Sequence, residues 1–259
     1  MTIVDVTDGT IKAPFSIGDG KVVYFSQGNL QYKATTNEWR FAEEQYDVIG
    51  EDNKNISASY SGWIDLFGWA TSGYQNNYPY STSTESNVLE DISGTQYDWG
   101  QNAIINGGNQ QGLWRTLTRT EWENLMSRWD SEQQDFRCYR VRINGVYGLL
   151  LVPDNWKWGA SGVGYAPYCK EEISDSKWRN WQKYGAVFLP EEGSIHQNSV
   201  SDTVTYQSWD YGYWSSTPYA TNYVGYVYYV EWGICGEKDI NYSGLRKQGY
   251  CVRLVRDKQ

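Results

Sequence analysis

Catalytic chemistry in this chain would have to use its one histidine or its acidic side chains. A serine–histidine–aspartate or cysteine–histidine site needs an imidazole that orients and deprotonates the nucleophile. The only histidine, His196, lies in the segment EEGSIHQNSV, which carries neither a serine nucleophile motif nor a second imidazole for a transition-metal site. We therefore predict that His196 is a surface or capping residue and that the chain has no catalytic residues.

Three pairs of adjacent glutamates are the acidic groups that could serve glycoside hydrolysis. They are Glu43 and Glu44, Glu171 and Glu172, and Glu191 and Glu192. That reaction needs two carboxyl groups that face each other about 5 to 9.5 Å apart. Adjacent residues of a chain rarely face each other, so these pairs are predicted to lie in solvated acidic loops.

Metal and disulfide chemistry have little support in the sequence. Residues 51–55 (EDNKN) are rich in oxygen ligands but lack the spacing of an EF-hand loop. We predict no cofactor, with a structural calcium ion as an open alternative. The four cysteines, Cys138, Cys169, Cys235 and Cys251, form no CxxC pair. They are either buried free thiols or one or two disulfides, and disulfides would indicate an oxidising compartment.

The composition favours many short strands joined by ordered loops. Aromatic residues make up 17% of the chain, with 14 tryptophans and 23 tyrosines, and glycine and polar residues separate them. The net charge of -9 provides no basic stripe for a phosphate backbone, so we expect no nucleic-acid partner. No apolar run is long enough to cross a bilayer, and the start MTIVDVTDGTIKAPF lacks the apolar core of a signal peptide. We expect no membrane insertion.

Local patterns predict one helix and several strands within a single domain, 1–259, that begins with an extended arm, 1–20. Thr118 is a helix N-cap, and apolar residues at i, i+3 and i+4 follow it, so a helix should run to about Trp129. Asn144–Gly145 predicts a hairpin within 137–152. Further strands are expected in 21–32 with a turn at 28–29, and at 39–42, 185–189, 226–232 and 250–256.

The long polar stretch 47–109 is expected to be an elaborated insertion rather than a structureless loop. Four aromatic residues should pin it to the core: Trp63, Phe67, Trp69 and Trp99. In the last strand, period-two alternation places Cys251, Arg253 and Val255 on one face. Val252, Leu254 and Arg256 fall on the other.

Three segments, in this order, resemble a known family. WRTLTRTEWE (114–123), GYWSST (212–217) and GYCVRLVR (249–256) are similar to motifs of proteins related to the formylglycine-generating enzyme, and in particular to the C-type-lectin-fold variable proteins of diversity-generating retroelements. The resemblance implies an α+β, C-type-lectin-like fold with a small twisted antiparallel sheet, flanking helices and long ordered loops. It also implies that 211–256 is a ligand-facing segment.

The same resemblance argues against an enzyme. Formylglycine-generating enzymes use two cysteines a few residues apart near the C-terminus, whereas Cys235 and Cys251 are sixteen residues apart. The calcium-dependent sugar motifs EPN and WND of true lectins are also missing.

Tyrosine is concentrated in the predicted ligand-facing segment. Between Tyr211 and Ser243 there are eight tyrosines where the chain average gives about three. Tyrosine, serine and asparagine dominate recognition surfaces because tyrosine offers rigid amphipathic area at low entropic cost. The alternative is that these tyrosines cover a core. The predicted ligand-binding residues are Tyr219, Asn222, Tyr223, Tyr226, Tyr228, Glu231, Glu237, Asp239, Asn241 and Tyr242.

Other residues of these motifs should serve the scaffold. Trp214, Arg253 and Val255 are assigned to it, and Trp122 and Trp214 are expected in the core. The sequence thus predicts a non-catalytic recognition protein, an adhesin or phage receptor-binding protein that contacts a protein or glycan on a bacterial surface. It would be extracellular, at the cell surface or on a virion. The alternative is a carbohydrate-binding or carbohydrate-active enzyme domain.

Overall fold

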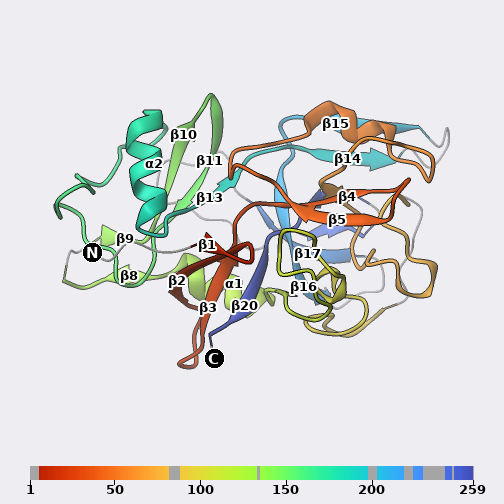
Figure 1. Ribbon diagram of the computed structural model, residues 1–259, viewed down its shortest axis with the longest axis horizontal. Helices are drawn as coiled ribbons and strands as arrows, with labels where there is room; N and C mark the ends of the chain where they lie inside the picture. Colours follow the sequence, from red (N-terminus) through yellow and green to blue (C-terminus); the bar gives the residue numbers. More distant parts are fainter. Residues whose placement is uncertain are drawn as a thin grey trace.

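The computed structural model describes residues 6–81, 88–132, 135–197, 203–218, 224–229, 243–246 and 248–258. Within these ranges the chain is a mixed α and β structure, with few helices and mostly small sheets (Figure 1). Most strand pairs are antiparallel; two are parallel, β10 with β12 and β16 with β19. The α+β class is therefore as predicted.

One five-stranded sheet joins the two ends of the chain. Its order is β1 (Val6–Thr7), β2 (Thr10–Ser16), β3 (Val22–Ser26), β20 (Leu254–Asp257) and β7 (Arg115–Thr116). The segment expected to be an N-terminal arm supplies β1 and β2, and its side chains Ala13 and Phe15 are fully buried. This segment is thus part of the first five-stranded sheet and of the core beneath it.

A second five-stranded sheet contains the predicted ligand-facing strands. Its order is β18 (Ser243–Leu245), β17 (Val224–Tyr229), β16 (Gly212–Pro218), β19 (Tyr250–Cys251) and β6 (Leu66–Phe67). The expected closing strand 250–256 is divided between this sheet and the first, because Val252 and Arg253 separate β19 from β20. Its alternation still holds: Cys251 and Val255 belong to one apolar cluster, and Val252 and Leu254 to another.

A third sheet carries its own helix. Its order is β12 (Glu171–Ile173), β10 (Cys138–Ile143), β11 (Val146–Leu151) and β13 (Val187–Pro190). Helix α2 (Asp175–Lys183) lies alongside it in Figure 1, and its Trp178 and Trp181 pack on the sheet's apolar side chains. The hairpin predicted at Asn144–Gly145 is confirmed, and both residues have positive φ, 49° and 80°.

Three two-stranded sheets and three short 3-10 helices complete the described structure. The sheets are β4 (Leu30–Lys33) with β5 (Glu38–Phe41), β8 (Trp129–Asp130) with β9 (Asp135–Phe136), and β14 (Ser194–Gln197) with β15 (Val204–Gln207). The 3-10 helices are η1 (Gly50–Asn55), η2 (Tyr74–Asn76) and η3 (Trp99–Gln101). All three belong to the insertion 47–109.

The insertion is held to the core by its aromatic residues. Phe67, Trp69 and Trp99 are fully buried, as predicted. Trp63 is only partly buried and lies under the guanidinium of Arg40, 4.0 Å from its ring centre. The predicted core residues Trp122 and Trp214 are also buried, at 1% and 0% exposure.

Helix α1 (Arg119–Met126) has the predicted N-cap. The Thr118 hydroxyl accepts a hydrogen bond from the Glu121 amide, and the Glu121 carboxylate accepts one from the Thr118 amide. This reciprocal pair satisfies two amides that have no partner within the helix. The helix ends at Met126, earlier than predicted, because Trp129 begins strand β8.

Candidate functional site

Strand β17 is the part of the predicted ligand-binding site that the structure describes. Tyr226 and Tyr228 lie on it, and their backbones pair with Ser243 of β18 and Tyr213 of β16. The strand predicted at 226–232 is observed at Val224–Tyr229, and 230–232 lie outside the described residues. Eight other predicted residues also lie outside them: Tyr219, Asn222, Tyr223, Glu231, Glu237, Asp239, Asn241 and Tyr242. The described residues on either side of these positions show how the segment is supported.

One buried side chain, Trp69, contacts the chain on both sides of residues 219–242. Its indole Nε1 donates a hydrogen bond of 2.9 Å to the Ser215 carbonyl of β16. Its backbone amide donates one of 2.8 Å to the Arg246 carbonyl, just after β18. The Arg246 guanidinium also lies 4.6 Å from the centre of the Trp69 ring. A single residue of the insertion therefore fixes the start and the end of the tyrosine-rich segment.

Trp214 holds β16 against its neighbours β6 and β19. Its Nε1 donates a 2.5 Å hydrogen bond to the Phe67 carbonyl of β6, and its ring meets that of Tyr250 edge to face, with 5.2 Å between ring centres. The register of β16 with β17 shifts between Trp214 and Pro218, as at a β-bulge. Bulges re-aim the strand that carries them. Trp214 thus belongs to the scaffold, as predicted.

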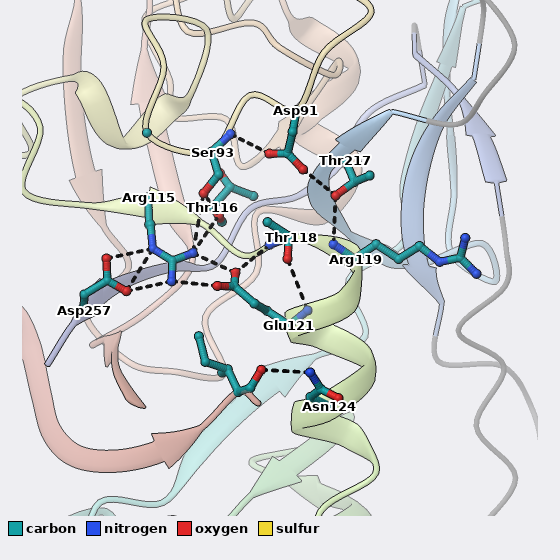
Figure 2. Close-up of polar contacts among 12 residues, drawn as sticks. Asp91, Ser93, Arg115, Thr116, Thr118, Arg119, Glu121, Asn124, Thr217 and Asp257 are labelled. Atoms are coloured by element: carbon teal, nitrogen blue, oxygen red, sulfur yellow. Dashed lines mark hydrogen bonds and ion pairs between the residues drawn. The ribbon is translucent and has the colours of Figure 1, made fainter. Parts of the chain in front are cut away.

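The end of β16 is tied to the start of helix α1 by a short polar chain, which Figure 2 shows. The Thr217 hydroxyl donates to the Asp91 carboxylate at 2.6 Å and accepts from the Arg119 amide at 3.0 Å. The Ser216 amide donates to the Leu117 carbonyl at 2.9 Å. The last residues before position 219 are therefore held between the helix and the insertion.

Arg115 continues this network to the C-terminal strand. Its guanidinium pairs with Glu121 at 2.7 Å and with Asp257 at 2.7 Å (Figure 2). Burial disfavours the charged guanidinium, but the hydrogen bonds to Asp257 and Glu121 outweigh burial and raise the pKa of Arg115. Two carboxylates already neutralise this cation, so it serves the scaffold rather than an anionic ligand. Sequence reasoning did not single out Arg115, although it lies in the motif WRTLTRTEWE.

His196 is surrounded by polar groups, but not in the geometry of a catalytic triad. In a triad, serine and carboxylate contact different nitrogens of the ring. Here Ser194 Oγ at 2.8 Å and Asp210 Oδ2 at 2.6 Å both contact His196 Nε2. The other nitrogen, Nδ1, lies 2.8 Å from the Gln248 amide nitrogen. His196 was predicted as a surface or capping residue; it is instead a hydrogen-bonded residue of β14 whose side chain is 21% exposed.

The prediction of a solvated acidic loop is wrong for Glu191 and Glu192. Glu191 forms two 2.6 Å hydrogen bonds with the guanidinium of Arg140, and both side chains are only 6% exposed. Glu192 is buried and accepts hydrogen bonds from the Ile49 and Gly50 amides. These carboxylates are buried because partners distant in the sequence satisfy them.

Glu192 forms a buried carboxyl pair with Asp65. The Asn53 amide nitrogen donates to both, at 2.8 Å to Asp65 and 3.2 Å to Glu192. Burial, followed by the nearby charge of Glu192, raises the pKa of Asp65 well above its ordinary value. The Cys251 thiol donates to Glu192 at 3.3 Å. The folded protein therefore holds a proton on the Asp65 carboxyl group under conditions in which the unfolded chain releases it.

Replacing Glu192 with glutamine is expected to make stability less dependent on pH. A carboxyl pKa that is higher in the folded state gives stability that is complete at low pH and is lost as the pH rises through that raised pKa. Glu192→Gln removes the neighbouring charge and retains an oxygen for the three donors to Oε1. Chemical denaturation at pH 5 to 8 should show a gain over wild type that grows with pH, by at most about 1.4 kcal/mol per pH unit.

A control for this experiment is Glu172→Gln, because the Glu172 side chain is exposed. Between pH 5 and 8 its effect on the unfolding free energy should not change with pH. A Glu192→Gln difference that does not change with pH would contradict the expected coupling between the two carboxyl groups.

Among the residues that the structure describes, no group of three or more His, Cys, Asp or Glu side chains is arranged to hold a metal ion. The run 51–55 forms most of η1, where Glu51 pairs with Lys54 and Asn53 turns inward to Asp65. Two of the cysteines, Cys138 and Cys251, are buried free thiols, and Cys169 is disulfide-bonded. Both alternatives for the cysteines therefore occur in this chain.

No helix in the described ranges combines the length and hydrophobicity needed to cross a membrane.

Comparisons of the chain with protein-family models, curated proteins and solved structures found no match.

Proposed function

We propose that this protein is a non-catalytic ligand-recognition protein with a C-type-lectin-like fold, in which residues 219–242 form the recognition surface. The observation that carries the proposal is the double contact of Trp69 with Ser215 and Arg246, on either side of those residues. A recognition surface benefits from a rigid base, because ordering a loop on binding reduces affinity.

The second support is the contrast between the base and the segment. Trp69, Trp214 and Arg253 are fully buried. The segment between β16 and β18 instead holds tyrosines, asparagines and acidic residues. A fixed, buried base that carries a segment of recognition residues resembles a paratope on its framework. The partner we propose is a protein or glycan on a bacterial surface, bound by a protein that is extracellular, at a cell surface or on a virion.

The retroelement part of the proposal concerns how the segment acquires its sequence. In the variable proteins that the motifs resemble, adenines of this segment are mutated, so that asparagine codons become codons for tyrosine, serine, aspartate or glycine. Sequencing the DNA around the gene tests this directly. A near-identical template repeat beside a reverse transcriptase gene supports diversification, and a locus without either contradicts it.

Alanine substitution of Tyr223, Tyr226 and Tyr228 tests the recognition surface. We expect melting temperatures close to that of wild type in all three variants. Binding to the bacterial cells that wild type labels in flow cytometry should weaken by about 2 kcal/mol, roughly thirtyfold in Kd, for the central residues of the site. Hot-spot residues behave in this way because they contact the ligand and not the core.

Tyr213→Ala is the matched control. Tyr213 is fully buried and hydrogen-bonds to Asn29 and to the Pro190 carbonyl, so its loss should lower the melting temperature strongly. If all three test variants lose as much stability as Tyr213→Ala, their tyrosines cover a core and the proposed surface is wrong.

A further inference from the structure

A groove on the insertion has the lining of a small-ligand site. It lies between the β4–β5 turn and the loops around η2 and η3, with a volume of about 450 Å³. That volume falls within the range of about 300–1,000 Å³ in which proteins hold small molecules. All eleven residues that line it are described, and they come from between positions 32 and 111. The groove is therefore separate in sequence from the segment 219–242.

The lining of the groove is polar but uncharged. None of its eleven residues is Asp, Glu, Lys, Arg or His, although charged residues make up 20% of the chain. A phosphate, carboxylate or ammonium group taken from water into this groove would meet no opposite charge, and desolvating such a group without a partner is costly. The groove therefore favours a neutral, hydrogen-bonding ligand.

Two tyrosines give the groove rigid aromatic faces. Tyr74 and Tyr78 are 38% and 40% exposed. Each is braced by a second tyrosine: Tyr97 meets Tyr74 edge to face at 5.0 Å, and Tyr80 stacks on Tyr78 at 5.0 Å. Because these rings are already fixed, a ligand that packs on them loses little side-chain entropy on binding.

Three glutamines give the groove hydrogen-bonding groups. Within the described ranges, the side chains of Gln96, Gln101 and Gln111 donate no hydrogen bond and accept none, and Gln96 and Gln111 are exposed. The nearby Asn102 differs, because its amide donates to the Ser72 and Trp99 carbonyls and holds the wall in place. A primary amide offers two donors and one acceptor oxygen, which suits adjacent hydroxyls that each donate and accept.

We propose that this groove binds a neutral saccharide. The apolar face of a sugar ring would pack on Tyr74 and Tyr78, and its hydroxyls would bond to the glutamine amides. This site goes beyond the proposed recognition surface and does not depend on it. A saccharide is the ligand class that combines an apolar ring face, many hydroxyls and no charge.

The test is an array of neutral hexose and N-acetylhexosamine oligosaccharides, with sialylated and sulfated oligosaccharides and uncharged peptides as further arms. Wild type should bind one or more neutral oligosaccharides. Calorimetry with the strongest of these should show a roughly tenfold or greater loss of affinity in Tyr78→Ala and in Gln101→Ala. Tyr78→Phe, which keeps the ring, should retain most of the affinity.

Two controls locate the binding. Tyr165→Ala removes a tyrosine that is 84% exposed and does not line the groove, so the affinity should not change. A variant with alanine at Tyr223, Tyr226 and Tyr228, assayed at a temperature at which it remains folded, should also bind the saccharide as wild type does, because none of these residues lines the groove.

The proposal is overturned if only acidic saccharides or peptides bind, or if no arm binds. It is also overturned if the Gln101→Ala variant, which lacks one of the amides that line the groove, melts like wild type and binds the saccharide equally well. Because Gln101 makes no side-chain hydrogen bond within the described residues, this second variant keeps the test valid even if Tyr78→Ala does not fold.

Discussion

Trp69→Ala is expected to lower the free energy of unfolding by about 3–5 kcal/mol, the usual cost of removing a fully buried indole. Trp69 is 0% exposed and packs in the cluster that includes Trp214, Phe67 and Tyr250. The substitution leaves a cavity, removes the donor to the Ser215 carbonyl and removes the ring beneath Arg246.

The change should also affect the segment that Trp69 supports. With the contacts to Ser215 and Arg246 weakened, residues 219–242 should be cleaved by chymotrypsin faster, at concentrations of denaturant where the rest of the chain stays folded. Urea denaturation measures the first effect, and mapping of the cleavage sites measures the second.

Trp69→Phe is the matched control, because it keeps most of the apolar volume and loses the indole nitrogen. It should cost less than alanine and still cleave faster than wild type within 219–242, since the hydrogen bond to Ser215 is gone. If both variants cleave like wild type, Trp69 does not hold the segment, and the main support for the proposed recognition surface is lost.

Local sequence patterns predicted the elements whose structure is decided locally. The capping box at Thr118 and Glu121 and the turn at Asn144–Gly145 need only nearby residues, so the sequence was sufficient for both. Helix α2 has comparable signals that were missed, with Ser174 as N-cap and Trp178 and Trp181 at i and i+3. These local signals were sufficient to predict the helix.

Features that depend on tertiary partners were not predictable in this way. The division of 250–256 into β19 and β20 depends on β6, β16, β3 and β7, which lie up to about 230 residues away. The burial of Glu192 depends on Asn53 and on amides near position 50. A carboxylate that is exposed in one fold is buried in another when such partners are present.

The two candidate sites differ in the same respect. The tyrosine-rich segment is continuous, so its composition could be recognised from the sequence alone. The groove collects residues from Tyr32 of β4 to Gln111, and no short window of the sequence contains more than a part of it. The double role of Trp69 was only half predicted: its burial followed from the aromatic pattern, but its contacts with Ser215 and Arg246 required the fold.

Arg253→Ala should cost about as much as Trp69→Ala, roughly 3–5 kcal/mol, because it leaves several buried acceptors without a donor at about 1–3 kcal/mol each. Arg253 was assigned to the scaffold from the sequence, and its side chain is completely buried. Its guanidinium donates to the Ser26 carbonyl at 2.8 Å and to the Gln45 amide oxygen at 2.9 Å. It also lies 3.3 Å from the Phe188 carbonyl of β13, so it joins the first and third sheets.

Two opposing effects decide the result for this residue. Burial lowers the pKa of Arg253 to about 10, so the group stays charged at pH 7 and the fold bears the cost of desolvating it. Its hydrogen-bonded oxygens belong to neutral groups, and each oxygen that loses its donor costs about 1–3 kcal/mol. Because several acceptors lose their donor, we expect the cost of the lost hydrogen bonds to exceed the free energy gained by no longer desolvating a charged group.

Arg253→Met separates these effects, because methionine fills most of the space without donating a hydrogen bond. We expect a loss of about 2 kcal/mol or more in urea denaturation at pH 7, smaller than that of alanine, which also leaves a cavity. Arg253→Lys keeps the charge but cannot reach acceptors in several directions at once, so it should also be destabilising. A methionine variant as stable as wild type would show that the desolvation cost dominates and that the apolar stem of Arg253, rather than its hydrogen bonds, connects the sheets.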